Sequence, residues 1–449
     1  MKELRPFFNP KSILIVGVSR KTYTFSYTLL KNLLEIFYEG KIYLLNPNAT
    51  DILGIKSYHN YEDLPEIPEL AVIVLGSDII NNIENLGKIG VKFITIQSEI
   101  KSDIENKELL DKLKNLCLKY NISYLGPSMI GIINFIDKFT NSIVPVRQHI
   151  MRANKKISEG IGFIAQSGGL AGALGWWTPF QKLPISKVIH LGKSFDINES
   201  DILKYYCKDN TIKVISIFLR EITDELIKSV KLVAPKKPIL VFYVGKDIQK
   251  EKQLEQAGGV FVLNYIELFE IAKLFLWCPE PNGSNLGIIG PSSGVIYIIA
   301  KEMRKQHLSL AKLNEISKEK ILENVGGSTC KLGNPVDFWP PDKFIGTKIC
   351  SIYKKASHIL LEDESVNALF LALEFFIEIE FDFIIFKKIK EFYPNKPIIS
   401  ILIQAETEGA KRVINTASEL KIPVFVNEIE RAVRGYKLLY DYYSKIKKK

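Results

Sequence analysis

Short apolar stretches alternate along this chain with longer segments in which apolar residues recur every three or four positions. Stretches rich in β-branched residues predict buried strands, and the longer segments predict amphipathic helices. Near the N-terminus we expect strands at residues 12–16, 41–45, 70–75, 92–96 and 122–125, with helices between them. Strands that are apolar along their whole length and separated by helices indicate a parallel sheet covered on both faces.

Two later blocks share one plan: an apolar run, a turn of glycine and serine, and then a helix. Residues 191–196 and 332–337 share the pattern Leu-Gly-x-x-x-Asp, and a Lys-Pro pair precedes a strand in each block. Such repetition indicates a duplicated domain. We expect an α/β protein with a Rossmann-like first domain and two flavodoxin-like domains, at residues 1–150, 156–280 and 284–445.

The glycine and serine turns are the first candidates for chemistry. Backbone N–H groups and the positive dipole end at the start of a helix bind anions. We therefore expect anion- or phosphate-binding residues at Gln166, Ser167, Gly168, Gly169, Ser292, Ser293 and Gly294, and with them Asn334 and Asp337.

Composition narrows the class of protein. Sixty Lys and Arg residues against fifty Asp and Glu residues give a formal net charge of +10, which suits an anionic partner such as a nucleotide. No basic and aromatic motif of nucleic-acid recognition is present, so DNA or RNA binding is not expected. The five cysteines are scattered without a CxxC pair, which indicates a reducing compartment and no metal site. The charged N-terminus is not a signal peptide, and the most apolar stretch, 367–386, holds four acidic residues. We expect a cytoplasmic protein that does not enter a membrane.

Short motifs then point to one family. They are Phe8-Asn9-Pro10-Lys11-Ser12, Ile15-Val16-Gly17-Val18-Ser19-Arg20, Leu125-Gly126-Pro127 with Gly131, Gln166-Ser167-Gly168, Leu191-Gly192 with Asp196, and Gly333-Asn334-Pro335-Val336-Asp337. In this order they resemble the NDP-forming acyl-CoA synthetases, above all the α subunits of ADP-forming acetate–CoA ligases, whose relatives include succinyl-CoA synthetase. The resemblance covers nearly the whole chain.

The resemblance implies that the first domain binds coenzyme A, through Gly17, Ser19, Arg20, Lys21, Asn46, Pro47, Gly126, Pro127 and Ser128. It implies that ATP or ADP, with Mg²⁺, is bound only through a partner subunit with an ATP-grasp fold; a homo-oligomer is the alternative assembly. In the family, that partner phosphorylates a histidine on a mobile loop of the α chain, and the phosphate passes to the acid to form an acyl phosphate.

Two departures separate this chain from the family. The bulky residues 22–25 replace the glycines and lysine of the first turn, which should leave less room for a pyrophosphate. The family's histidine loop is missing, because residues 245–257 are too few to form it and contain no histidine. The remaining catalytic candidates are His190, at the end of a predicted strand, and Glu221, one position beyond the place expected for the family's carboxylate.

Backbone contacts cannot replace the histidine, because a phosphate acceptor must bond covalently to phosphorus. We therefore interpret the chain as an α-subunit-like family member that binds CoA, acyl-CoA or a nucleotide without phosphorylating itself. One alternative is an active, divergent ligase subunit working with an ATP-grasp partner, with His190 or another chain as the acceptor. Another is a transferase that moves an acyl or carbamoyl group without ATP.

Overall fold

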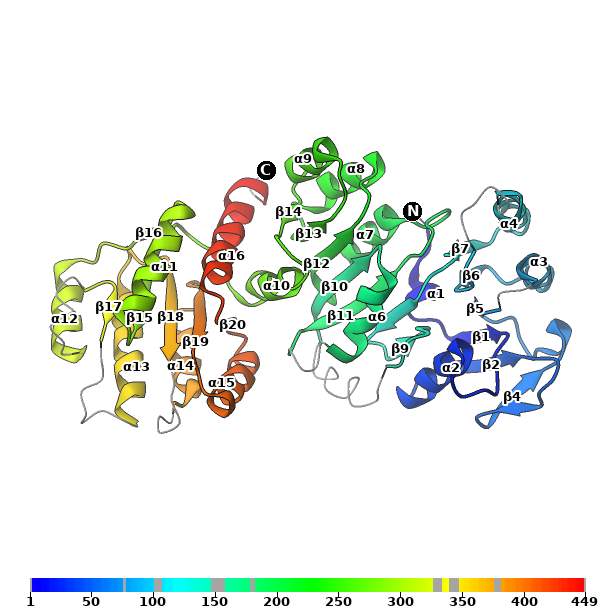
Figure 1. Ribbon diagram of the computed structural model, residues 1–449, viewed down its shortest axis with the longest axis horizontal. Helices are drawn as coiled ribbons and strands as arrows, with labels where there is room; N and C mark the ends of the chain where they lie inside the picture. Colours follow the sequence, from blue (N-terminus) through cyan, green and yellow to red (C-terminus); the bar gives the residue numbers. More distant parts are fainter. Residues whose placement is uncertain are drawn as a thin grey trace. The chain divides into compact units, whose positions relative to one another are not determined.

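The computed structural model describes residues 2–75, 78–100, 107–146, 158–177, 182–325, 333–338, 347–374 and 381–447. The chain divides into two compact units, Met1–Val262 and Leu263–Lys449. The first unit contains two sheets and the second contains one (Figure 1). The α/β fold with largely parallel sheets that the sequence predicts is confirmed.

The first sheet has seven strands and only its β3–β4 pair is antiparallel. In spatial order the strands are β3 (Asp51–Ile52), β4 (Ile55–Tyr58), β2 (Lys41–Leu45), β1 (Ser12–Val16), β5 (Leu70–Ile73), β6 (Phe93–Ile96) and β7 (Ser123–Leu125). The helices are α1 (Arg5–Phe8), α2 (Phe25–Glu35), the short η1 (Tyr61–Asp63), α3 (Ile79–Ile89) and α4 (Lys107–Tyr120). Leu14 and Val16 of β1 share a core with α3 and α4, and every residue of β1 is buried. The uninterrupted apolar run of β1 follows from this covering of both faces.

The second sheet also has seven strands. In spatial order they are β14 (Val260–Phe261), β13 (Ile239–Tyr243), β12 (Ile212–Leu219), β10 (Gly160–Ala165), β11 (Ile185–His190), β8 (Gly131–Asn134) and β9 (Phe139–Thr140). Its helices are α6 (Gly168–Trp177), α7 (Glu199–Lys208), α8 (Asp224–Val233) and α9 (Ile248–Gln256). Strands β8 and β9 form an antiparallel edge, although the sequence groups these residues with the first domain.

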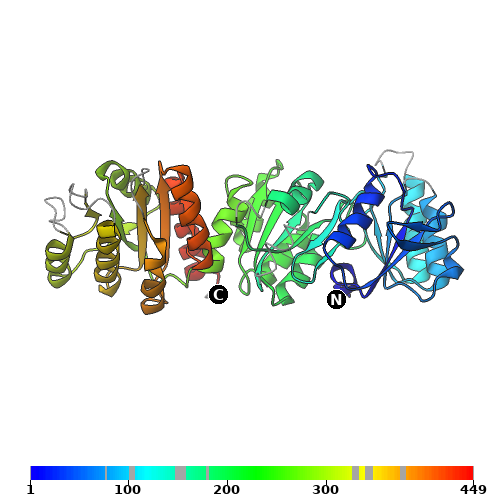
Figure 2. The same ribbon diagram turned by 90° about the horizontal axis from the view of Figure 1, so that it is seen from below.

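The third sheet is parallel and lies between two layers of helices (Figure 2). Its strands are β16 (Ser309–Leu310), β15 (Asn285–Gly290), β18 (Ala368–Glu374), β19 (Ile398–Ile403) and β20 (Val424–Val426), with β17 (Val336–Asp337) also paired to β15. The helices are α10 (Glu267–Trp277), α11 (Ser293–Lys305), α12 (Glu315–Val325), α13 (Thr347–Glu362), η5 (Phe383–Ile385), α14 (Phe386–Phe392), α15 (Thr407–Glu419), α16 (Ile429–Asp441) and η6 (Tyr442–Ile446).

Helix α10 belongs to the second unit, where it packs on α16. A Cβ atom on Gly435 of α16 would overlap Leu274 of α10, so the two helices approach closely. Arg431 of α16 also forms an ion pair with Glu270 of α10. The sequence grouped this helix with the second domain at 156–280, and the bounds of the three domains stay a prediction.

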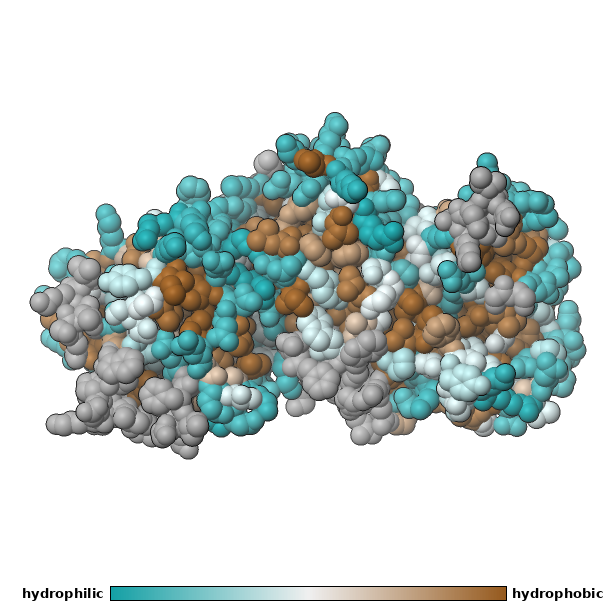
Figure 3. Space-filling model, in the orientation of Figure 1, coloured by the Kyte–Doolittle hydropathy of each residue, from teal (hydrophilic) through white to brown (hydrophobic). Residues whose placement is uncertain are grey.

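Polar side chains cover most of the face of each unit seen in Figure 3, with smaller apolar areas between them. Among the described residues, no helix is both long enough and apolar enough to span a membrane.

A buried ion pair gives a test of the packing of the second sheet. Lys187 of β11, with a side chain only 3% exposed, lies 2.7 Å from Asp209 and donates to Thr211 Oγ1 at 3.0 Å. Asp209→Asn leaves this buried ammonium without its nearest carboxylate, and we expect the free energy of unfolding to fall by about 3 kcal/mol near neutral pH.

The effect should depend on pH. Burial raises the pKa of Asp209, but hydrogen bonds from Lys187 and Thr211 outweigh it, so the pKa lies below the usual value. The stability lost in Asp209→Asn is therefore present above pH ~4 and shrinks as the pH falls through the pKa of the folded protein. Urea unfolding measures it, with Glu108→Gln at an exposed pair as a control that should change stability by less than about 0.5 kcal/mol. Equal effects of the two variants would show that the pair is not buried in solution.

Candidate functional site

The first sheet has its topological switch point at β1. The chain runs from β1 to β2 on one side and later crosses to β5 on the other, so the crevice at the carboxyl ends of these strands is where ligands of such sheets bind. Gly17 directly follows β1 with φ +91°, and a Cβ atom there would overlap Leu75. Only glycine therefore lets the chain turn here.

The turn between β1 and α2 is held by its own hydrogen bonds. The N–H of Ser19 donates to Ser26 Oγ at 3.0 Å, and the N–H of Lys21 donates to Ser19 Oγ at 3.1 Å. Thr24 caps α2 by accepting from the N–H of Tyr27 at 3.4 Å. Several N–H groups that a glycine-rich loop would offer to a phosphate are thus used inside the turn.

Positive charge at this turn comes from two exposed side chains, Arg20 and Lys21. Arg20 donates to the carbonyl of Asn48 at 2.7 Å, which ties the turn after β1 to the turn after β2. Tyr23, one of the bulky residues of this turn, is 83% exposed. The expectation that these residues leave less room for a pyrophosphate stays a prediction.

Asn46 and Pro47 form the turn after β2. The Asn46 side chain donates to the carbonyl of Val18 at 2.6 Å and accepts from the N–H of Asn48 at 2.7 Å. Asn46 therefore shapes the edge of the crevice with both of its polar groups, and Pro47 stays exposed.

A second turn, Gly126-Pro127-Ser128, closes the same edge of the sheet after β7. Gly126 has φ +93°, and a Cβ atom on it would overlap the carbonyl of Ile96. The N–H of Ser128 donates to the Ser98 carbonyl at 3.0 Å, and its Oγ accepts from the N–H of Ile100 at 3.1 Å. Ser128 thus fastens the loop after β6 to the turn.

This second turn also contacts the second sheet. The N–H of Lys193 donates to the Pro127 carbonyl at 2.8 Å, and a Cβ atom on Gly192 would overlap that carbonyl. The N–H of Ile130 donates to His190 Nδ1 at 2.9 Å, and the Ile130 side chain lies against Gly168. The carboxyl ends of the first two sheets therefore meet; we call this contact the seam, formed by residues 126–130, 190–193 and 168.

Gln166 is fixed by four hydrogen bonds at the carboxyl end of β10. Its Oε1 accepts from the N–H groups of Arg220 and Glu221 at 2.6 and 3.0 Å, and its Nε2 donates to Glu199 at 2.9 Å and to the Glu221 carbonyl at 3.4 Å. Gln166 therefore positions the turn before α6 and has no polar group left for a ligand. A Cβ atom on Gly169 would meet nothing within 4 Å, so the start of α6 is open on that side.

Glu199 is a residue of this region that the sequence did not single out. It begins α7 and is 7% exposed, with its carboxylate held by Gln166. Helix α7 opens with a capping box between Asn198 and Asp201, and this motif, read from the sequence, would have marked the start of the helix.

His190, a catalytic candidate, uses its ring in a hydrogen bond to the backbone. A backbone N–H can only donate, so Nδ1, which accepts from Ile130, is the unprotonated nitrogen and Nε2 carries the proton. Burial lowers the pKa of His190 to about 4, so the ring is neutral near pH 7. The lone pair of Nδ1 thus accepts the backbone hydrogen bond. The protonated Nε2 has no free lone pair for attack on phosphorus.

The other catalytic candidate, Glu221, has an exposed side chain, and its backbone is what contacts Gln166. Beyond β13 the chain enters α9 almost at once, because Asp247 caps that helix by accepting from the N–H of Lys250 at 3.0 Å. All of residues 245–257 are described, and none of them is a histidine.

The predicted anion turn of the third sheet is lined by carboxylates. Ser293 Oγ donates to Asp337 at 2.5 Å at the start of α11, beside Ser292 and Gly294. Burial raises the pKa of Glu374, and a hydrogen bond from Ser292 opposes the shift. These two carboxyl groups next to the helix start disfavour the binding of an anionic ligand there.

Asn334 serves the sheet. Its Nδ2 donates to the carbonyls of Leu286 and Ala311 at 3.0 and 2.9 Å, and its Oδ1 accepts from the N–H of Ile288 at 3.1 Å. Every polar group that Asn334 would offer to an anion is engaged in these bonds.

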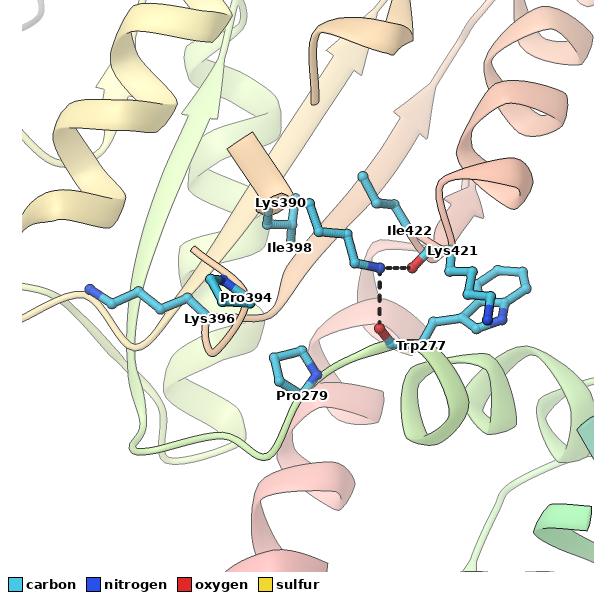
Figure 4. Close-up of a pocket in the computed structure, with 8 residues that line it drawn as sticks. All are labelled: Trp277, Pro279, Lys390, Pro394, Lys396, Ile398, Lys421 and Ile422. Atoms are coloured by element: carbon cyan, nitrogen blue, oxygen red, sulfur yellow. Dashed lines mark hydrogen bonds between the residues drawn. The ribbon is translucent and has the colours of Figure 1, made fainter. Parts of the chain in front are cut away.

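A pocket in the second unit is lined by three lysines (Figure 4). Two of them use their ammonium groups to bind backbone carbonyls. Lys390 of α14 donates to the carbonyls of Trp277 and Lys421, and Lys396 donates to those of Leu361 and Asp363. Burial lowers the pKa of both lysines. They tie helix ends together. No group of metal-ligating side chains occurs within the described parts of the chain.

Two family models match the first unit of the chain. Residues 11–134 match the CoA binding domain model, and residues 158–255 match the succinyl-CoA ligase like flavodoxin domain model. The chain is 28% identical over 471 aligned positions to the ADP-forming acetate–CoA ligase I subunit alpha of Pyrococcus furiosus, covering 98% of this chain and 97% of that protein. It is 29% identical to the ADP-forming acetate–CoA ligase of Methanocaldococcus jannaschii, over 75% of this chain and 49% of that protein.

Over nearly its whole length the chain is thus similar to the α subunit of an ADP-forming acetate–CoA ligase. It spans about half the length of the Methanocaldococcus jannaschii relative. The fold matches that of an acetyl-coenzyme A synthetase from Ca. Korarchaeum cryptofilum with a TM-score of 0.86 at 24% identity, covering 99% of this chain and 98% of that one. The Rossmann-like domain followed by flavodoxin-like domains is thus confirmed. None of these findings tests the individual site residues, which stay predictions.

The state of His190 can be measured directly. Its depressed pKa contributes stability that is present above the unfolded value near 6.5 and is lost as the pH falls toward 4. Wild type should therefore lose about 2 kcal/mol between about pH 7.5 and pH 5, relative to His190→Asn, whose amide oxygen can also accept from Ile130. Chemical denaturation of both proteins tests this; parallel pH profiles would contradict a buried neutral ring.

Proposed function

We propose that this chain binds coenzyme A or an acyl-CoA as a ligase α subunit does, and that it carries no phosphate on a histidine of its own. Three candidate regions, the turns after β1, β2 and β7, share the carboxyl edge of the first sheet. Arg20 and Lys21 supply the positive charge that the CoA phosphates require, while Gly17, Ser19 and Asn46 shape the turns.

The seam supports a CoA that extends from the first sheet toward the start of α6. The turn at residues 126–128 contacts the second sheet through Gly192 and Lys193, and Ile130 reaches from it to Gly168 at the start of α6. A ligand anchored on the first sheet can therefore extend toward the α6 turn within one unit. There Ser167, Gly168 and Gly169 offer backbone N–H groups to a carboxylate or acyl group.

The observation that carries the second half of the proposal is the hydrogen bond from Ile130 to His190. It fixes the proton on Nε2, so His190 cannot accept a phosphoryl group without losing a buried backbone bond. The chain enters α9 directly after β13, and residues 245–257 contain no histidine. Glu221, the other catalytic candidate, has an exposed side chain.

A second function is favoured by the open side of α6 at Gly169. An active, divergent ligase would use this turn for an acyl phosphate made elsewhere. The phosphate carrier and the site for ATP or ADP with Mg²⁺ would then belong to another chain, either an ATP-grasp β subunit or a second copy.

Calorimetry with CoA tests the binding half of the proposal. We expect the full chain to bind CoA, and we expect Lys21→Gln to weaken binding about fivefold to tenfold because one charge-assisted contact to phosphate is lost. Lys112→Gln, on the exposed surface of α4, is the control and should leave the affinity unchanged. Absence of heat with wild type at millimolar CoA would remove CoA from the account.

Incubation with γ-labelled ATP and an ATP-grasp subunit tests the catalytic half. We expect no acid-labile label on this chain, because the Nδ1 of His190 accepts from the N–H of Ile130 and residues 245–257 contain no histidine. A relative that retains the loop histidine serves as the positive control under the same conditions. Acid-labile label on this chain that disappears in His190→Ala would establish the active ligase instead.

A further inference from the structure

Two aromatic side chains stand exposed in the turn between β1 and α2. Tyr23 is 83% exposed and Phe25 is 66% exposed, although the neighbouring residues of the turn are short, polar or basic. A single exposed ring is ordinary on a protein surface. Two rings within three residues, at the carboxyl edge of a parallel sheet, form an exposed apolar surface at the end where ligands of such sheets bind.

The backbone of the turn gives these rings a common side. Thr24, between them, is extended with φ −89° and ψ 151°, and its Oγ1 donates to the Lys21 carbonyl at 2.8 Å and accepts from Tyr27. Residues on either side of an extended residue lie on the face opposite to its side chain. Thr24 faces the helix it caps, so Tyr23 and Phe25 face solvent together.

Positive charge lies next to these rings. Lys21 is two residues from Tyr23, and Arg20 is held against the turn after β2 by its bond to Asn48. Exposed aromatic rings beside cationic side chains are the combination that binds a nucleobase together with its phosphates, since bases stack on rings and phosphates pair with the cations.

The geometry points to Tyr23 and Phe25 as the surface on which the adenine base of CoA stacks, with Lys21 at the neighbouring phosphates. This inference rests on the proposed binding of CoA and adds the group that recognises its nucleotide end. The backbone N–H groups of Ser19 and Lys21 form hydrogen bonds inside the turn. Stacking on the rings therefore supplies a contact to CoA that these N–H groups do not. The pantetheine arm, which has no base, makes no use of these rings.

Calorimetry on the full chain with CoA and with 4′-phosphopantetheine tests the assignment. We expect Tyr23→Ala to weaken CoA binding about fivefold to a hundredfold, as loss of a stacked base does, with Phe25→Ala in the same direction. Binding of 4′-phosphopantetheine should stay unchanged, and Tyr23→Trp should retain the affinity for CoA. Tyr297→Ala removes an equally exposed ring (73%) on α11 and is the matched control.

Four other outcomes of this calorimetry would contradict the stacking surface. CoA affinities within twofold of wild type in both alanine variants would overturn the stacking surface and leave the proposed function intact. Equal weakening of CoA and 4′-phosphopantetheine would overturn it as well, because the turn would then act through its shape. ADP binding as tight as CoA and equally lost in Tyr23→Ala would assign the rings to a free nucleotide. Failure of wild type to bind CoA would end both the proposed function and this inference.

Discussion

The backbone of Gly192 lies so close to the carbonyl of Pro127 that any side chain at position 192 would overlap it. The next residue, Lys193, donates its N–H to the same oxygen. Nearby in the chain, the N–H of Ile130 donates to His190 Nδ1. These contacts hold the carboxyl ends of two separate sheets against each other. They join the turn after β7 to the end of β11 and, through Ile130, to the start of α6.

The seam also supports the proposal that His190 does not carry a phosphate. A histidine at the end of a strand, next to a glycine-rich helix start, has the position expected of a phosphate acceptor. Its ring is instead used to satisfy the N–H of a residue that crosses between the sheets. Gln166 has a similar role, since its four hydrogen bonds join the ends of β10 and β12 and hold the buried Glu199. Both side chains position the backbone and neither is free to react.

Much of the fold could be predicted because it follows from local pattern. Apolar runs gave strands such as β2 at the residues expected, and the glycine turns after β1 and β7 proved to need φ values that glycine adopts freely. The pairing of β8 with β11 could not be predicted, because it joins residues far apart in sequence. The apolar pattern of a strand does not indicate which other strand it pairs with. The apolar helix α10 fits either neighbouring sheet by pattern, and only packing on α16 decides.

The candidate site itself stays a prediction. Sequence marks where strands end, whereas the hydrogen-bond partners of Asn334 and Gln166 and the exposure of Tyr23 depend on side-chain geometry. A crystal structure of the full chain with CoA tests the central claim most directly. The account predicts the adenine and phosphates at the turn after β1, and the thiol end reaching across the seam toward the start of α6, with no phosphorylated side chain beside it. CoA bound away from the carboxyl edge of the first sheet, or a phosphohistidine within reach of Gly168, would contradict it.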